Sequence, residues 1–162
     1  MSIAVVYYSV SGNSRYVARK LAKRLHAKLI EIVETDPIRG VFGFLKGGFR
    51  AVTNRYPSIE GAPWKEIAPH DTVYLLTPIW ASRGAPAMAA FLQAADFSGK
   101  EIFIATLQAD PSGQGSHRVQ ESMRHRIEKK GGSVEQSYTL HTAPPGRFAG
   151  EEHLEQELSK IL

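Results

Sequence analysis

Three short polar segments of the sequence contain residue types that could bind a phosphorylated ligand. The first, Ser9-Val10-Ser11-Gly12-Asn13-Ser14, places three hydroxyl groups and one amide around a single glycine. It lies between an apolar run and a stretch with helical spacing, where unpaired backbone N–H groups and the helix dipole favour an anion. Neither the lysine-containing triphosphate pattern nor the three-glycine dinucleotide pattern is present. The segment predicts a terminal monophosphate site, although serine and asparagine are also ordinary helix caps and turn residues.

The second segment, Thr77-Pro78-Ile79-Trp80-Ala81-Ser82-Arg83-Gly84, brings a tryptophan to the end of an expected strand. A flat apolar ring system is stabilised by stacking on such a side chain, and loop amides can bond its polar edge. The alternative is that Trp80 fills the core. Arg83 could reach an incoming phosphate, and a surface position explains this arginine equally well.

The third segment, Gln108-Ala109-Asp110-Pro111-Ser112-Gly113-Gln114-Gly115, contains no aromatic residue. Its glycines would let the backbone approach a ring closely, but turn formation explains the same glycines. If no aromatic side chain covers this side of a bound ring, a second flat molecule such as a nicotinamide or a quinone could stack there.

The order of these segments resembles the flavodoxin family. The phosphate loop of that family has the form Thr-x-Thr-Gly-x-Thr, in which serine replaces every threonine here, and a Thr-Pro-Ile-Trp segment commonly flanks the flavin ring. The third segment is compatible with the second flavin loop, but it lacks the tyrosine or tryptophan of many electron carriers. The resemblance implies that flavin mononucleotide, FMN, is bound by Ser9, Ser11, Gly12, Asn13, Ser14, Thr77, Pro78, Ile79, Trp80, Ala81, Gln108 and Gly113.

The same resemblance implies flavin redox chemistry without a catalytic side chain of the protein's own. We expect a reductase that moves hydride from NAD(P)H to a quinone-like or other small acceptor, and alternatively an electron carrier between redox partner proteins. Carriers of this family are typically acidic, whereas this chain carries a net charge of +4 at pH 7, which favours a reductase. A flavin-free interaction module is a further alternative. Some relatives form homodimers, and the sequence does not decide whether this chain does.

Strands that alternate with helices favour a parallel sheet covered on both faces. We expect a flavodoxin-like α/β fold, a doubly wound five-stranded parallel sheet of order 2-1-3-4-5 in three α/β/α layers. The three segments then follow the first, third and fourth strands, at the edge where such folds bind ligands. From apolar runs and helical spacing we expect strands at 3–8, 29–33, 72–76, 101–107 and 133–140, and helices at 15–25, 85–94, 116–130 and 151–162.

The stretch 36–69 is too long for an ordinary connection between two such elements. Its aromatic residues predict a helix at 44–52 that packs on the sheet, with a mobile lid or a partner-binding surface as the alternative.

Length and composition fit a single domain, 1–162, in which 43% of the 162 residues are apolar. No apolar run could cross a bilayer and no signal sequence precedes the first strand, so we expect a cytoplasmic protein without membrane insertion. The absence of cysteine excludes disulfides and thiolate metal sites, and the six histidines lack metal-ligand spacing, so no metal is expected. The basic stretches lack interleaved aromatic residues, which argues against nucleic acid as a partner.

Overall fold

The computed structural model describes residues 1–35 and 56–162, and these residues form a parallel sheet of strand order β2-β1-β3-β5-β6. When the five parallel strands are numbered by their position in the sequence, they lie side by side in the order 2-1-3-4-5. The predicted strand order is therefore confirmed. The strands are β1 (Ile3–Tyr7), β2 (Lys28–Glu31), β3 (Thr72–Trp80), β5 (Glu101–Gln108) and β6 (Ser133–His141).

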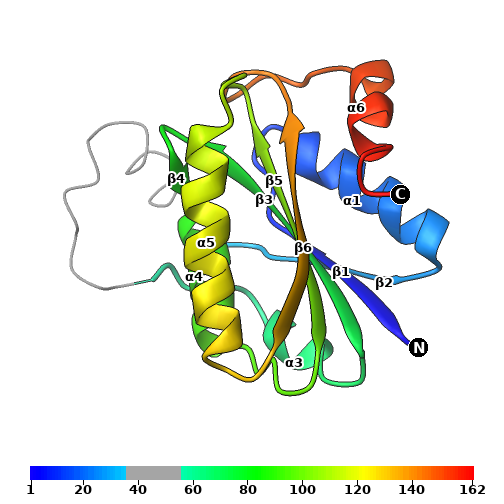
Figure 1. Ribbon diagram of the computed structural model, residues 1–162, viewed down its shortest axis with the longest axis vertical. Helices are drawn as coiled ribbons and strands as arrows, with labels where there is room; N and C mark the ends of the chain where they lie inside the picture. The colour runs from blue at the N-terminus through cyan, green and yellow to red at the C-terminus, as the bar shows by residue number, and fades with distance from the viewer. Residues whose placement is uncertain (36–55) are drawn as a thin grey trace.

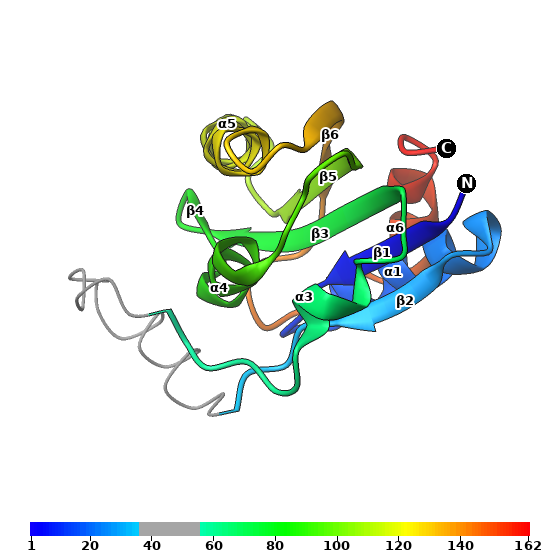
Figure 2. The same ribbon diagram turned by 90° about the horizontal axis from the view of Figure 1, so that it is seen from below.

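Helices cover both faces of the sheet (Figure 1, Figure 2). α1 (Asn13–Leu25) and α6 (Glu151–Leu158) lie on one face, and α3 (Pro63–Glu66), α4 (Pro86–Ala94) and α5 (Gln114–Glu128) lie on the other. The predicted three-layer arrangement is therefore confirmed.

The inner strand β1 is apolar throughout because both of its faces are buried. Successive side chains of a strand point to opposite faces of the sheet. Ala4 and Val6 accordingly belong to the buried cluster under α4 and α5, whereas Val5 and Tyr7 belong to the cluster under α1 and α6. A strand buried on both sides needs apolar residues at every position.

Two of the helices begin immediately after a glycine in the left-handed region. Gly12 has φ 90° before α1, and Gly113 has φ 72° before α5. Glycine adopts this conformation without the steric cost that a Cβ would bring, and the chain can turn from a strand end into a helix within a few residues. The predicted helices are present with shifted ends: α5 already begins at Gln114, and α6 ends at Leu158.

The third strand runs beyond its predicted end at residue 76. Pro78 still pairs with Leu107 of β5, and Trp80 then pairs with Arg83 of the short antiparallel strand β4 (Arg83–Gly84). The turn between them consists of Ala81 and Ser82, with φ 46° and 61°. Such two-residue turns normally contain asparagine or glycine, so nothing in the sequence marked this hairpin.

Part of the stretch 36–69 can be compared with its prediction. Glu34 bridges to Ile59 in antiparallel fashion, and α3 follows. The predicted helix at 44–52 lies outside the described residues. Within the described residues, no helix combines the length and the apolar character that crossing a bilayer requires.

Candidate functional site

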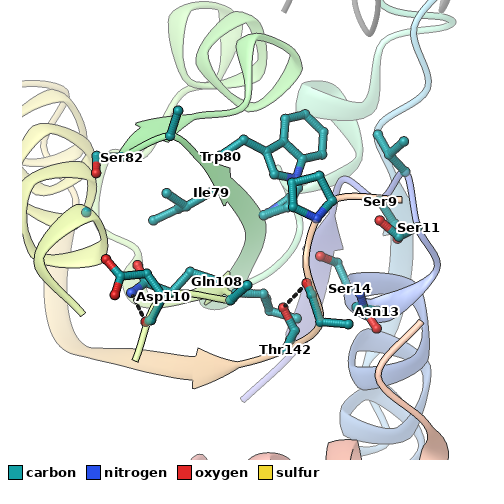
Figure 3. A pocket seen from close by; sticks show the side chains of 18 residues that line it. Ser9, Ser11, Asn13, Ser14, Ile79, Trp80, Ser82, Gln108, Asp110 and Thr142 are labelled. Atoms are coloured by element: carbon teal, nitrogen blue, oxygen red, sulfur yellow. Dashed lines mark hydrogen bonds between the residues drawn. The ribbon is translucent and has the colours of Figure 1, made fainter. Parts of the chain in front are cut away.

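A pocket opens at the carboxyl edge of the sheet, where the loops after β1, β3, β5 and β6 meet (Figure 3). The residues at the start of α1 lie on one side of it, Gln108 and Asp110 lie on another, and Trp80 extends from β3. The cavity measures about 160 Å³. Its lining residues are Ser9, Val10, Ser11, Asn13, Ser14, Pro78, Ile79, Trp80, Ala81, Ser82, Leu107, Gln108, Ala109, Asp110, Gly115, Thr142, Ala143 and Pro145.

The side of the pocket formed by α1 suits an anion. The N–H of Gly12 donates to Ser9 Oγ at 3.2 Å, which closes the loop into a tight turn. No side chain caps the N-terminus of α1, and its first turn contains no acidic residue. The partial positive charge of the helix terminus, roughly half an elementary charge, is therefore not offset by a carboxylate of the helix itself.

The hydroxyl of Ser14 is buried in this first turn. Ser14 is 2% exposed, and its Oγ has no hydrogen-bond partner in the part of the chain that the structure describes. Buried polar groups are nearly always bonded, and an unsatisfied one costs about 1–3 kcal/mol. Because Ser14 also lines the pocket, its hydroxyl is a candidate donor to a bound anion.

Asn13 and Ser11 hold the loop that follows β6. The Nδ2 of Asn13 donates to the carbonyl of Arg147 at 2.8 Å, and its Oδ1 accepts from the N–H of Ala149 at 2.9 Å. The N–H of Gly146 donates to Ser11 Oγ at 3.1 Å. The Asn13 amide thus bonds to the protein itself, whereas the Ser11 hydroxyl still has its own proton to donate.

This loop forms a fourth wall of the pocket, which was not predicted from the sequence. Thr142, Ala143 and Pro145 line the cavity, and the N–H of Thr142 donates to the carbonyl of Gln108 at 2.8 Å. The available signal was the Pro-Pro-Gly cluster directly after the last strand. Because that strand is parallel to its neighbour, its carboxyl end must reach the same edge of the sheet.

Trp80 takes part in both the core and the pocket. Its side chain is half-buried against the cluster under α4 and α5, and it also lines the cavity. The core interpretation therefore applies in part, and stacking of Trp80 on a bound ring stays a prediction. It is the only aromatic residue among the described residues that line the pocket.

The hairpin turn beside Trp80 is held in an unusual conformation. Ala81 and Ser82 both have positive φ, which costs residues with a Cβ about 1–3 kcal/mol each. The start of α5 packs directly on this turn, because a Cβ on Gly115 would lie 2.8 Å from Ser82 Cα. Glycine at 115 therefore permits the close approach that positions the turn at the rim.

Gln108 belongs to a buried polar network between β5 and α5. Its Nε2 donates to the carbonyl of Asp110 at 2.6 Å, and its Oε1 accepts from the N–H and the hydroxyl of Ser116 at 2.9 and 2.6 Å. Thr106 Oγ1 lies 2.9 Å from Ser116 Oγ and accepts from Gln120 Nε2 at 2.7 Å. Gln108 thus lines the pocket, but its amide positions the third segment.

Asp110 places a negative charge at the rim of the pocket. The backbone N–H of Ser112, and then its hydroxyl, hold the pKa of the Asp110 carboxyl below the ordinary value of 3.8. Asp110 is exposed and is therefore ionised at neutral pH. The pocket has an anion-attracting end at α1 and an anion-repelling carboxylate at the third segment.

Three of the predicted site residues do not line this pocket. Gly12 and Gly113 shape the starts of α1 and α5, and Thr77 is fully buried and lines a separate cavity between α4 and α5. Residues 1–35 and 56–162 contain no group of three or more His, Asp or Glu side chains that could hold a metal ion.

Comparisons with known proteins give matches in structure only. No protein-family model matches the chain, and no curated protein sequence matches it. Among the similar solved structures are a Trp repressor binding protein from Bacillus subtilis (19% identity, TM-score 0.69, covering 98% of this chain and 95% of that one) and a flavodoxin, WrbA-like protein from Agrobacterium tumefaciens (14%, 0.68, 97% and 90%). A third is a flavoprotein in complex with FMN from Lactobacillus acidophilus (13%, 0.59, 85% and 92%).

These likenesses extend over most of each chain, and they agree with the strand order and the layers described above. At such low identity they concern the path of the backbone and not the ligand or the reaction. The chain therefore has the flavodoxin-like fold.

Proposed function

We propose that this pocket binds FMN and that the protein uses it as an NAD(P)H-dependent reductase of a quinone-like or other small acceptor. The observation that carries the proposal is the buried Ser14 hydroxyl, which has no partner among the described residues and lies at the uncapped N-terminus of α1. A phosphate would accept hydrogen bonds there from this hydroxyl and from the N–H groups of the first helical turn.

The remaining donors of the phosphate end would be the hydroxyls of Ser9 and Ser11. Trp80, Ile79 and Pro78 offer apolar surface for a flavin ring, and they line the same cavity. Sites that enclose a whole ligand usually measure about 300 Å³ or more, and this cavity is smaller. A ligand as large as FMN would therefore extend over the open rim, where Asp110 disfavours a second anionic group.

The similar structures support a flavin as the ligand. One of them contains FMN, and another is described as a flavodoxin, WrbA-like protein. Flavins accept either a hydride or single electrons, and the chemistry belongs to the cofactor. The residues of this chain would bind the phosphate, orient the ring and leave one side of it accessible.

The composition of the pocket wall favours a reductase over an electron carrier. The third segment contributes Gln108, Ala109, Asp110 and Gly115, and none of these residues has an aromatic side chain that could stack on a ring. A nicotinamide could therefore approach from that side and later be replaced by the acceptor. An electron carrier that passes electrons to a partner protein is the second candidate, because the similar structures include flavodoxins.

Anaerobic mixing of the FMN-loaded protein with NADPH or NADH tests the reductase. We expect bleaching of the visible flavin absorbance that is much faster than for free FMN under the same conditions, followed by recovery when a quinone is added. Absence of bleaching in protein that dithionite does reduce would contradict the reductase and would favour the electron carrier. Protein that stays colourless after incubation with FMN would contradict both.

A further inference from the structure

A second cavity lies between α4 and α5, next to the β3–β4 hairpin. Its volume is about 320 Å³, within the range of small-molecule sites. The hairpin lies between this cavity and the first pocket, because Arg83 and Gly84 line the second cavity whereas Ala81 and Ser82 line the first. The lining residues are Thr77, Arg83, Gly84, Ala85, Met88, Ala89, Leu92, Arg118, Val119, Ser122, Met123 and Arg126.

The floor of this cavity is apolar and well packed. Met88 and Leu92 are 2% exposed, and Met123 is 4% exposed, so these side chains belong to the core beneath. Met88 and Leu92 come from α4 and Met123 comes from α5. A floor of this kind favours an apolar body of a ligand, and methionine adapts its shape readily.

Three guanidinium groups surround this floor. Arg83 and Arg118 are exposed, and no carboxylate of the described residues lies within ion-pair distance of either one. Arg126 donates to the hydroxyl of Tyr56 and to the carbonyl of Ala89, and its guanidinium lies 5.4 Å from the centre of the Tyr56 ring. The positive charge of the cavity is thus not neutralised by any acidic residue that lines it.

We propose that this cavity binds a small organic anion, a carboxylate or a phosphate ester attached to an apolar body. Guanidinium groups bond such anions through two parallel N–H donors, and a concave apolar floor weakens the competition from water. The site is distinct from the FMN pocket and does not depend on FMN binding. A solvated set of surface arginines over a hollow is the competing explanation, and it predicts no preference for an apolar anion.

The methionines of the chain provide a direct probe. Two of the three, Met88 and Met123, line the cavity, whereas Met1 is 91% exposed at the N-terminus and lies outside it. In protein labelled with carbon-13 at the methionine methyl groups, naphthoate should shift the Met88 and Met123 signals in a saturable manner and leave Met1 in place. Neutral naphthamide should bind about tenfold more weakly or worse, because it cannot form the charged hydrogen bonds.

Variants separate this site from a general attraction of anions. Arg118→Gln and Arg83→Gln should each weaken naphthoate binding by about tenfold, whereas the matched change Arg19→Gln on α1, away from the cavity, should not. Ala89→Phe, which fills the cavity, should abolish the shifts while the circular dichroism spectrum stays unchanged.

Two results would overturn the proposal. One is that naphthoate moves none of the methionine signals at millimolar concentration. The other is that sodium sulfate at the same ionic strength moves Met88 and Met123 as much as naphthoate does, which is the behaviour of solvated arginines.

Discussion

The Ser14 hydroxyl combines deep burial with the lack of a partner among the described residues, at a place where helix N–H groups converge. Such a group destabilises the ligand-free protein and stabilises the complex. The same side chain therefore affects stability and affinity in opposite directions, which a residue of purely structural importance does not do.

Replacement Ser14→Ala should leave the ligand-free protein as stable as before, or up to about 1 kcal/mol more stable, because it removes an unsatisfied hydroxyl. FMN binding should weaken by about 1.5–3 kcal/mol, since a charged hydrogen bond is lost. Urea unfolding and quenching of FMN fluorescence measure the two effects. Ser58→Ala, at an exposed position before α3 where the side chain makes no hydrogen bond within the described residues, should change neither quantity. A loss of stability without a loss of affinity would assign Ser14 to the scaffold alone.

The two tryptophans of the chain form a matched pair. Both pack on the cluster under α4 and α5, but only Trp80 lines the pocket. Trp80→Ala should weaken FMN binding by about 1–3 kcal/mol through loss of a stacked apolar surface. Trp64→Ala should reduce stability and leave the affinity of the folded protein for FMN intact. Equal affinities of both variants and the wild type would place the ring elsewhere.

At the scale of elements, the β5–α5 network fixes the third segment. Gln108 is 2% exposed, and both ends of its amide are bonded to that segment or to α5. Gln108→Ala should leave the Ser116 donors and the Asp110 carbonyl without their partner. We expect a loss of about 1–3 kcal/mol in the free energy of unfolding, measured in urea with an unchanged slope.

The exposed glutamine of α4 is the control for that experiment. Gln93→Ala should change stability by less than about 0.5 kcal/mol, because its side chain lies on the surface. If Gln108→Ala lowered the free energy of unfolding no more than Gln93→Ala does, the β5–α5 network would not be what holds the third segment in place.

The same elements show what sequence could and could not predict. Strand β1 was predictable because a strand buried on both faces must be apolar throughout. The hairpin after Trp80 was not, because alanine and serine do not favour the positive φ of this turn, and Ser82 is held by packing against Gly115. A tertiary contact with α5 stabilises this turn, and local sequence patterns contain no information about such contacts.

Contacts between different segments of the chain also determine which side chains at the site remain available to a ligand. Gln108 was predicted as a cofactor residue from the resemblance to flavodoxins, and its amide oxygen accepts hydrogen bonds from Ser116 on α5. Asn13 was predicted in the same way, and it bonds to Arg147 and Ala149, residues far away in the sequence. The sequence predicted which loops form the site. The packing between these loops determines which of their side chains remain available to a ligand.

At the scale of the whole molecule, the last helix anchors the sheet edge that forms the pocket. Glu157 of α6 is 8% exposed, and it accepts from the N–H of His141 at the end of β6 and from Lys160. Burial alone would raise the pKa of Glu157, but Lys160 and the His141 N–H outweigh it and lower the pKa below the ordinary value of 4.5. The packing of α6 on the sheet is thereby linked to the position of the loop after β6, which lines the pocket.

This lowered pKa predicts how stability depends on pH. The contribution of Glu157 is fully present above pH 4.5 and is lost as the pH falls through the lower pKa of the folded state. Glu157→Gln should therefore destabilise the protein at pH 7 and differ less from the wild type near pH 3, as measured by urea unfolding at each pH. A difference that does not change with pH would contradict the assignment, and Glu152→Gln at an exposed position serves as the control.

If the start of α1 binds a phosphoryl group, the affinities of FMN and riboflavin for the protein must differ. The two ligands share the ring and differ in the phosphate. We predict that FMN binds at least about a hundredfold more tightly than riboflavin, because several charged hydrogen bonds form only with the phosphate. Equal affinities for the two ligands, or binding of neither, would show that the start of α1 is not a phosphate site.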